Sequence, residues 1–186
     1  DFDSNAYKRD IKAGNDAMSY FQSLLTYKPK RQVFTCGNHE GRIGRVKKMD
    51  KSVDAFISYD DLNLKQFGVE FVDFMLPIEV DGIFYCHYFS SGPMGKSIQS
   101  ARMLLMKKHN NICQGHIQHF QQHIEILPNG RPITGLIAGC SYEHELDYLG
   151  PYQGTHYARQ IWYCSDVSDG RFNPERIGME VIRSLV

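Results

Sequence analysis

Three two-residue turn signals place the strongest limit on how this chain can fold. Asp-Gly at positions 81 and 169 and Asn-Gly at position 129 each separate two segments rich in β-branched and aromatic residues. These pairs favour the two-residue turns of β-hairpins, where the backbone takes a left-handed conformation. The sequence therefore predicts antiparallel hairpins in its second half, with strands over 69–80, 83–87, 119–127, 132–140, 158–167 and 176–186.

The first half has a different pattern. Apolar residues recur at helical spacing over residues 5–27, with Ser4 as the expected N-cap. Residues 31–36 then form an expected buried strand, and the polar segments up to about Gly68 favour helix. A further helix is expected over 97–109, with Ala101, Leu104 and Leu105 facing inward, followed by a short strand over 110–115.

Helices alternating with strands, followed by hairpins, predict a mixed α/β fold in which sheets pack on each other with helices outside. At 186 residues, with no linker or repeat, the expected organisation is one domain over 1–186. Lysine plus arginine (21) equals aspartate plus glutamate (21), so no overall positive charge attracts nucleic acid.

Composition also bears on the compartment. No apolar run approaches the roughly 20 residues that a membrane helix needs, and the first residues lack the layout of a signal peptide. The five cysteines are widely spaced, without a C-x-x-C pair. We therefore expect buried thiols, no membrane, and a location in the cytoplasm.

Three expected strands end in side chains that can bind metal. They are followed by Gly-Asn-His-Glu at 37–40, by Cys-His-Tyr at 86–88 and by Gly-His at 115–116. A lone histidine such as His87 is more often a structural residue, whereas a G-N-H-[DE] string arises by chance on the order of once in several hundred sequences. Because ligand sites assemble at the ends of strands, the three segments together predict one site.

These segments resemble the calcineurin-like metallophosphoesterase family: G-N-H-E after a strand, a histidine ending a later strand, and a G-H-x-[HQ] motif further on. The likeness covers nearly the whole chain. It implies a four-layer α/β/β/α fold, a mixed β-sandwich flanked by helices, and hydrolysis of a phosphomonoester or phosphodiester. In that family two divalent metals, about 3.5–4 Å apart, activate a bridging hydroxide.

The resemblance also implies roles for individual residues. Asn38 would bind the second metal through its amide oxygen, and His87 and His116 would add imidazole nitrogens. His39 would not bind metal but would stabilise charge on the phosphate and protonate the leaving oxygen as general acid.

Several further polar residues each have two interpretations. Arg42 and Arg45 are expected to bind the substrate phosphate, although they also fit a solvated helix face. Glu40 is interpreted as a cap or ion-pair partner of the following helix rather than as a ligand. The polar stretch from Glu143 to Asp147 is interpreted as a solvated loop, with a rim over the metals as the alternative.

The chain departs from the family pattern at its start. The family's D-x-H motif is absent, and of its G-D-x-x-D motif only the last aspartate has a counterpart, Asp1. That aspartate would hold His39 in its working tautomer. We therefore expect the first strands to be missing, and a fragment that is unstable, binds one metal weakly or lacks activity.

The second departure is Gln118, at a position where the family usually has histidine. Because an amide oxygen is a weaker ligand than imidazole for zinc, Mn²⁺ becomes the preferred metal, ahead of Mg²⁺, Zn²⁺ and iron. Together with segments such as "CHYFSSGPMGKSI", this glutamine resembles phage-encoded branches of the family. The resemblance implies a bacteriophage origin, a location in the cytoplasm of the host, and DNA or a nucleotide as substrate. The sequence indicates no oligomeric state.

Two alternatives have a different function. His116, His119 and His123 would form one face of a helix and bind zinc without hydrolysis, but the alternation towards the Asn-Gly turn favours a strand there. The other alternative is a non-catalytic scaffold of the same fold, since fold alone does not decide function.

Overall fold

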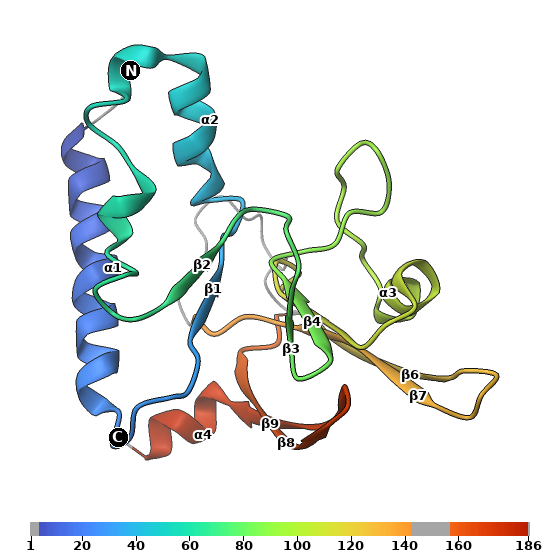
Figure 1. Ribbon diagram of the computed structural model, residues 1–186. Coiled ribbons are helices and arrows are strands. Elements are labelled where there is room, and N and C mark those ends of the chain that lie inside the picture. Colours follow the sequence, from blue (N-terminus) through green and yellow to red (C-terminus); the bar gives the residue numbers. More distant parts are fainter. Residues whose placement is uncertain (1–3, 143–156, 186) are drawn as a thin grey trace. The chain divides into compact units, whose positions relative to one another are not determined.

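The computed structural model describes residues 4–142 and 157–185, and the chain forms two compact units, residues 1–74 and 75–186. Each unit is described by itself. The described residues form helices and several separate β-sheets without a barrel, so the chain is mixed α/β as expected (Figure 1). The interpretation as one domain stays a prediction. No helix in the described ranges is long and apolar enough to cross a membrane.

The first unit combines helices with a two-stranded parallel sheet. Its strands pair in parallel, with Phe34 opposite Phe71. The elements are α1 (Ser4–Leu24), β1 (Val33–Thr35), α2 (Gly41–Met49), η1 (Lys51–Val53), η2 (Tyr59–Leu62) and β2 (Glu70–Val72).

Helix α1 is held to this unit by polar contacts as well as by packing. The Tyr7 hydroxyl donates to a carboxylate oxygen of Asp61 at 2.7 Å, and the Asn15 amide donates to the Asp61 carbonyl at 2.8 Å. Burial and this carboxylate raise the pKa of Tyr7 to about 12. The other end of the predicted helix is less well covered, since Phe21 and Leu24 are 52% and 59% exposed. The helix is therefore fixed mainly through its first half.

The second unit contains a five-stranded sheet of order β3-β4-β5-β7-β6, in which the three central strands are parallel and the two edge strands are antiparallel to their neighbours. Strands β8 and β9 form a separate antiparallel pair. The elements are β3 (Ile78–Val80), β4 (Ile83–Cys86), α3 (Ala101–Lys108), β5 (Ile112–Gln114), β6 (Phe120–Ile126), β7 (Pro132–Ala138), β8 (Gln160–Ser168), β9 (Arg171–Gly178) and α4 (Met179–Ser184).

All three predicted hairpins form, as β3–β4, β6–β7 and β8–β9. Asp81 and Gly82 have φ angles of 52° and 79°, the left-handed conformation at both turn positions that a type I′ turn requires. The last predicted strand, 176–186, is misplaced: β9 covers Arg171–Gly178, and a helix follows. Met179 and Ile182, three residues apart, are its half-buried side chains, a spacing that favours helix over strand.

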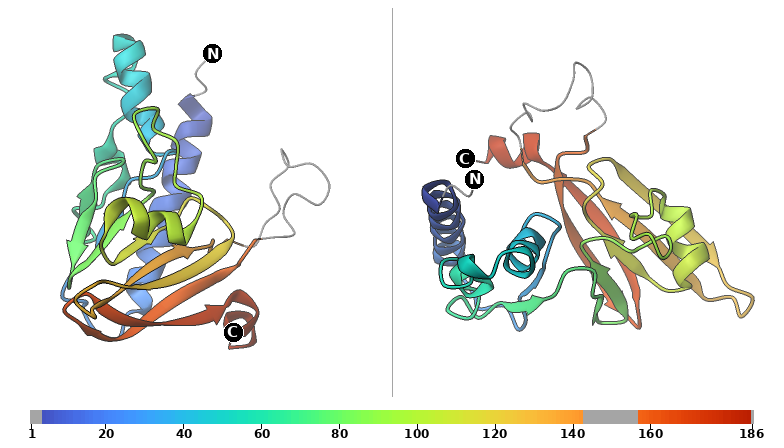
Figure 2. Two further views of the ribbon diagram at one scale, coloured as in Figure 1. Left: turned by 90° about the vertical axis from the view of Figure 1, so that its right-hand side faces the viewer. Right: turned by 90° about the horizontal axis from the view of Figure 1, so that it is seen from above.

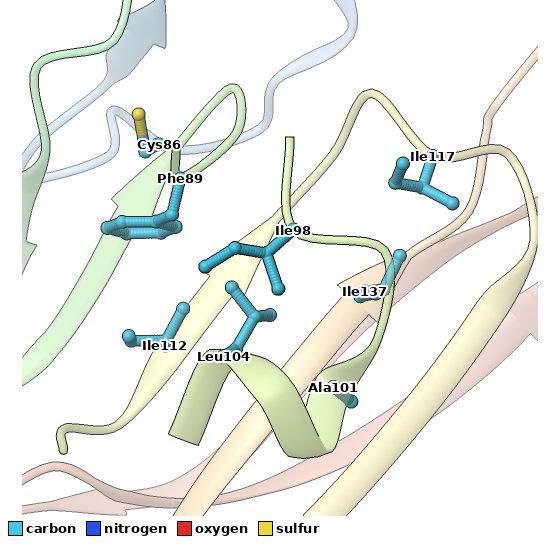
Figure 3. Packing of buried hydrophobic residues seen from close by; sticks show 8 residues of the cluster. All are labelled: Cys86, Phe89, Ile98, Ala101, Leu104, Ile112, Ile117 and Ile137. Carbon is cyan, nitrogen blue, oxygen red and sulfur yellow. The ribbon is translucent and has the colours of Figure 1, made fainter. Parts of the chain in front are cut away.

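The five-stranded sheet is covered on both faces. Helix α3 lies on one face, where Leu104 and Leu105 are fully buried as predicted (Figures 2 and 3). On the other face the Trp162 indole N–H donates to the Ala138 carbonyl at 2.8 Å, and its ring lies 5.1 Å from Phe120. The second unit is thus a helix–sheet–sheet arrangement. Its core cluster is Cys86, Phe89, Ile98, Ala101, Leu104, Ile112, Ile117 and Ile137.

Helix α3 approaches the sheet closely at Gly135. A Cβ atom there would lie 2.7 Å from the Ala101 carbonyl oxygen and 3.1 Å from Leu105 Cγ. We expect Gly135→Ala to lower the free energy of unfolding by about 1–3 kcal/mol, because helix and sheet must separate. Urea denaturation followed by circular dichroism measures this change.

The matched control is Gly14→Ala in α1, where an added Cβ meets no atom within 4 Å. This variant should gain about 0.5–1 kcal/mol, since alanine is the better helix former. Equal effects of the two substitutions would contradict the close packing of α3 on β7.

All five cysteines are free thiols, but the prediction that they are buried holds only for Cys36 and Cys86, since the other three are half-buried. Burial, and secondarily Glu40, raises the pKa of Cys36 to about 11, while burial and then Cys164 raise the pKa of Cys113 to about 12. The neutral thiol is therefore favoured in the folded protein, and the stability that it contributes is lost only as the pH rises from 9 through these values.

We accordingly expect iodoacetamide to modify Cys36 and Cys113 on the order of 100-fold more slowly at pH 8 in the native chain than in urea. The native rate should keep rising up to about pH 11. Mass spectrometry of peptides reads out each cysteine separately. A native rate that levels off near pH 9 would contradict the raised pKa values.

Candidate functional site

Two of the predicted site histidines lie side by side in the second unit. His87 follows β4 and His116 follows β5, and these parallel strands end with Cys86 opposite Gln114. His87 Nε2 lies 3.2 Å from His116 Nδ1, and the two rings are 5.0 Å apart at 67°. His87 is half-buried and His116 exposed. The register of the two strands therefore joins residues that are far apart in the sequence.

The backbone at His116 is unusual. Its φ angle is 62°, in the left-handed region that few residues with a Cβ adopt. The turn is tight, since the Ile117 N–H donates to the Gly115 carbonyl at 2.6 Å. Backbone strain of this kind is concentrated at functional sites, where it orients a side chain.

An aromatic side chain that the sequence reasoning missed completes this cluster. The Tyr88 ring lies 4.8 Å from the His116 ring and 5.8 Å from the His87 ring. Its hydroxyl donates to the Gly95 carbonyl at 3.0 Å, which ties the loop after β4 to the cluster. An aromatic residue directly after the candidate histidine was the available signal.

A second missed residue, Gln114, positions the two loops. It is 1% exposed, its amide oxygen accepts the Phe89 N–H at 3.0 Å, and its amide nitrogen donates to the Ile98 carbonyl at 2.8 Å. One buried side chain at the end of β5 thus fixes the segment that follows His87. An amide inside the apolar run before Gly115 was the signal for it.

The G-N-H-E segment lies in the first unit, in the turn between β1 and α2. The Glu40 carboxylate accepts the Gly37 N–H at 3.0 Å, and the Gly41 N–H donates to the Gly37 carbonyl at 2.9 Å. The interpretation of Glu40 as a side-chain cap is wrong, because its carboxylate bonds back to Gly37 and makes no cap bond to α2. The turn leaves His39 exposed.

The two arginines differ in their surroundings. Arg42 and His39 both line a largely apolar cavity of about 470 Å³ between α1 and α2. Arg45 instead donates to the Asn38 carbonyl at 3.3 Å. Arg42 is therefore the guanidinium that shares a cavity with His39, while Arg45 braces the backbone of the turn.

The structure does not bring the remaining predicted residues into contact with the histidine pair among the contacts it describes. Gln118 is half-buried, and its backbone carbonyl accepts the Ala158 N–H at 2.8 Å. Asp1 and the Glu143–Asp147 loop lie outside the described residues. Asn38 and His39 belong to the first unit and the histidine pair to the second, so their union in one centre stays a prediction. In the described ranges, no three or more His, Cys, Asp or Glu side chains gather as a metal site.

The histidine pair nevertheless fits two ligands of one metal ion. Imidazole nitrogens bind a transition-metal ion at about 2.0–2.1 Å, which places two neighbouring ligand nitrogens roughly 3.0–3.4 Å apart. The observed 3.2 Å lies in that range. Oxygen ligands such as the Gln118 amide would have to complete the coordination.

The alternative zinc site on a helix is wrong. Residues 120–126 form strand β6, so His116, His119 and His123 share no helix face. His119 Nε2 lies 2.9 Å from the amide nitrogen of Gln121, whose oxygen accepts the Ala101 N–H at the start of α3. His119 therefore takes part in packing between α3 and the sheet.

In comparisons with known proteins, no family model matches the chain, and neither a curated protein nor a solved structure matches it.

The role of Gln114 can be tested. Replacing it by the similarly shaped methionine leaves the Phe89 N–H and the Ile98 carbonyl buried without their partner, so Gln114→Met should cost about 1–3 kcal/mol of stability. The exposed Gln66, changed to methionine, is the control and should stay within about 0.5 kcal/mol of the parent. Urea denaturation measures both, and equal stabilities would refute a positioning role.

Proposed function

We propose that this protein is a divalent-metal-dependent phosphoesterase of the calcineurin-like type, acting on a phosphomonoester or phosphodiester. The observation that carries the proposal is the convergence of His87 and His116 at the ends of two parallel strands, at the spacing of two ligands of one ion. The proposal includes the complete four-layer sandwich, of which the helix–sheet–sheet arrangement of the second unit would be a part.

The proposal assigns a role to each of the predicted residues. His87 and His116 bind metal through ring nitrogens, Asn38 and Gln118 through amide oxygens, and Asp1 orients His39. Two bound metal ions would supply the hydroxide nucleophile for in-line displacement of the leaving oxygen. His39 donates its proton to that oxygen, so the alcohol departs neutral.

Arg42 is the better candidate of the two arginines for binding the phosphate. It shares a cavity with His39, the proposed proton donor. A guanidinium there can donate two parallel hydrogen bonds to phosphate oxygens. Arg45, which donates to the Asn38 carbonyl, would keep the metal-binding amide in place and contribute to catalysis indirectly.

The mixed donor set favours Mn²⁺. Imidazole nitrogen suits the transition metals, whereas amide oxygens suit the harder ions Mn²⁺ and Mg²⁺. Mn²⁺ is the ion that accepts both kinds of ligand readily. A phage-encoded enzyme of this type would act in the bacterial cytoplasm on DNA or nucleotides.

The test is hydrolysis of bis(p-nitrophenyl) phosphate and of single-stranded DNA by the natural gene product, with Mn²⁺. General acid catalysis contributes about 10²–10⁴-fold, so His39→Ala should lower kcat by at least about 100-fold while calorimetry still detects bound Mn²⁺. His116→Ala should lose Mn²⁺ binding as well as activity.

His123→Ala is the matched control, since His123 lies on β6, away from the proposed ligands; it should retain both activity and metal. Loss of activity in this variant, or full activity in His39→Ala, would refute the assignment of roles. A folded protein with neither turnover nor Mn²⁺ binding would instead support the non-catalytic scaffold.

A further inference from the structure

Strand β6 forms one edge of the five-stranded sheet, and no described strand pairs with its outer side. Ile124 on β6 lies opposite Thr134 on β7. The Thr134 N–H points away from β6 and donates to the Asn111 side chain. Ile124 and Thr134 are therefore a non-hydrogen-bonded pair of the antiparallel ladder. By the alternation of the ladder, Gln122, Ile124 and Ile126 direct their backbone N–H and C=O groups outward.

The side chains of this edge are unusually apolar. Ile124 and Ile126 are 55% and 64% exposed on one face of the strand. Edge strands that avoid pairing usually carry lysine, proline or a bulge, and β6 ("FQQHIEI") has no lysine, proline or break in register. The edge from Gln122 to Ile126 is thus open to strand addition.

We propose that β6 pairs antiparallel with β6 of a second copy of this chain, about a two-fold axis through Ile124. This register places Ile124 opposite Ile124 of the partner subunit, and Gln122 opposite Ile126 of the partner subunit. The outward backbone groups then meet as hydrogen-bonded pairs, which joins two five-stranded sheets into one. The inference is independent of the proposed activity.

Charge complementarity on the other face supports a second copy as the occupant. The same register puts His123 opposite Glu125 of the partner subunit, and the two-fold axis repeats this pair. These positions form non-hydrogen-bonded pairs, where opposing side chains lie closest. The imidazole can donate a hydrogen bond to the carboxylate, so the strand is complementary to itself.

Moving the axis by one residue, which shifts the register by two, is less favourable. With the axis at His123, that imidazole faces its own copy and both histidine–glutamate pairs are lost. That register would also need Phe120 at the interface. The Phe120 ring already packs on Trp162, and nearby the Gln118 carbonyl already accepts the Ala158 N–H. The axis at Ile124 needs only residues 122–126.

The expected dimer is weak. A short strand pair buries less surface than the roughly 1,200 Å² of the smallest stable interfaces. Sedimentation velocity of the whole chain from about 1 µM to about 1 mM should therefore show a dimer whose share rises with concentration. A monomer at every concentration would overturn the proposal.

Ile124→Lys tests the site, because it sets two ammonium groups together at the axis. We expect the dissociation constant to rise at least tenfold, with an unchanged circular dichroism spectrum. The matched control is Ile161→Lys, which makes the same change at an exposed isoleucine of β8 and should leave dimerisation intact. A dimer that survives Ile124→Lys, or that Ile161→Lys weakens equally, would overturn the proposal.

Changing the charges at positions 123 and 125 tests the register. This experiment also tests the proposal if Ile124→Lys fails to fold. Glu125→Lys should raise the dissociation constant roughly tenfold, because both pairs lose the carboxylate that accepts from His123. Adding His123→Glu to that variant places a carboxylate opposite an ammonium in both pairs and should recover the dimer. Failure of the double variant to recover would overturn the axis at Ile124.

Discussion

The parallel pairing of β4 with β5 is the contact on which the candidate site depends. It brings Cys86 opposite Gln114, so the residues that follow leave the sheet at the same edge. The buried Gln114 amide then bonds to both sides of the loop after β4, at Phe89 and Ile98. Without this pairing the two histidines, 29 positions apart, would have no reason to meet.

That pairing in turn depends on how the sheet is covered. Helix α3 lies against β7 at Gly135, the position where a side chain would hold helix and sheet apart. The β8–β9 hairpin covers the opposite face through Trp162. Residues 133–137 of β7 are accordingly all buried. The proposed ligands His87 and His116 and the proposed dimer edge β6 thus lie at different margins of one sheet.

Much of the fold was predictable where local chemistry decides the conformation. The hairpins follow from Asp-Gly and Asn-Gly, and the inward positions of α3 follow from the spacing of its apolar residues. Prediction failed at 179–184, where a helical spacing was read as the end of a strand, and it gave no sign that Phe21 and Leu24 on α1 are largely exposed. Helical periodicity locates the apolar face of a helix but not the surface that covers it.

The sequence by itself indicated the candidate residues of the site: the Asn38–His39 turn, and the histidines that follow two strands. The sequence also determined the hairpin turns, because the left-handed backbone conformation of an Asp-Gly pair depends on these two residues and not on contacts with distant segments. Only the tertiary structure decided that His87 and His116 lie 3.2 Å apart, that Tyr88 and Gln114 support them, and that β6 is an edge. Strand order and register arise from pairing between distant segments, which no local pattern encodes.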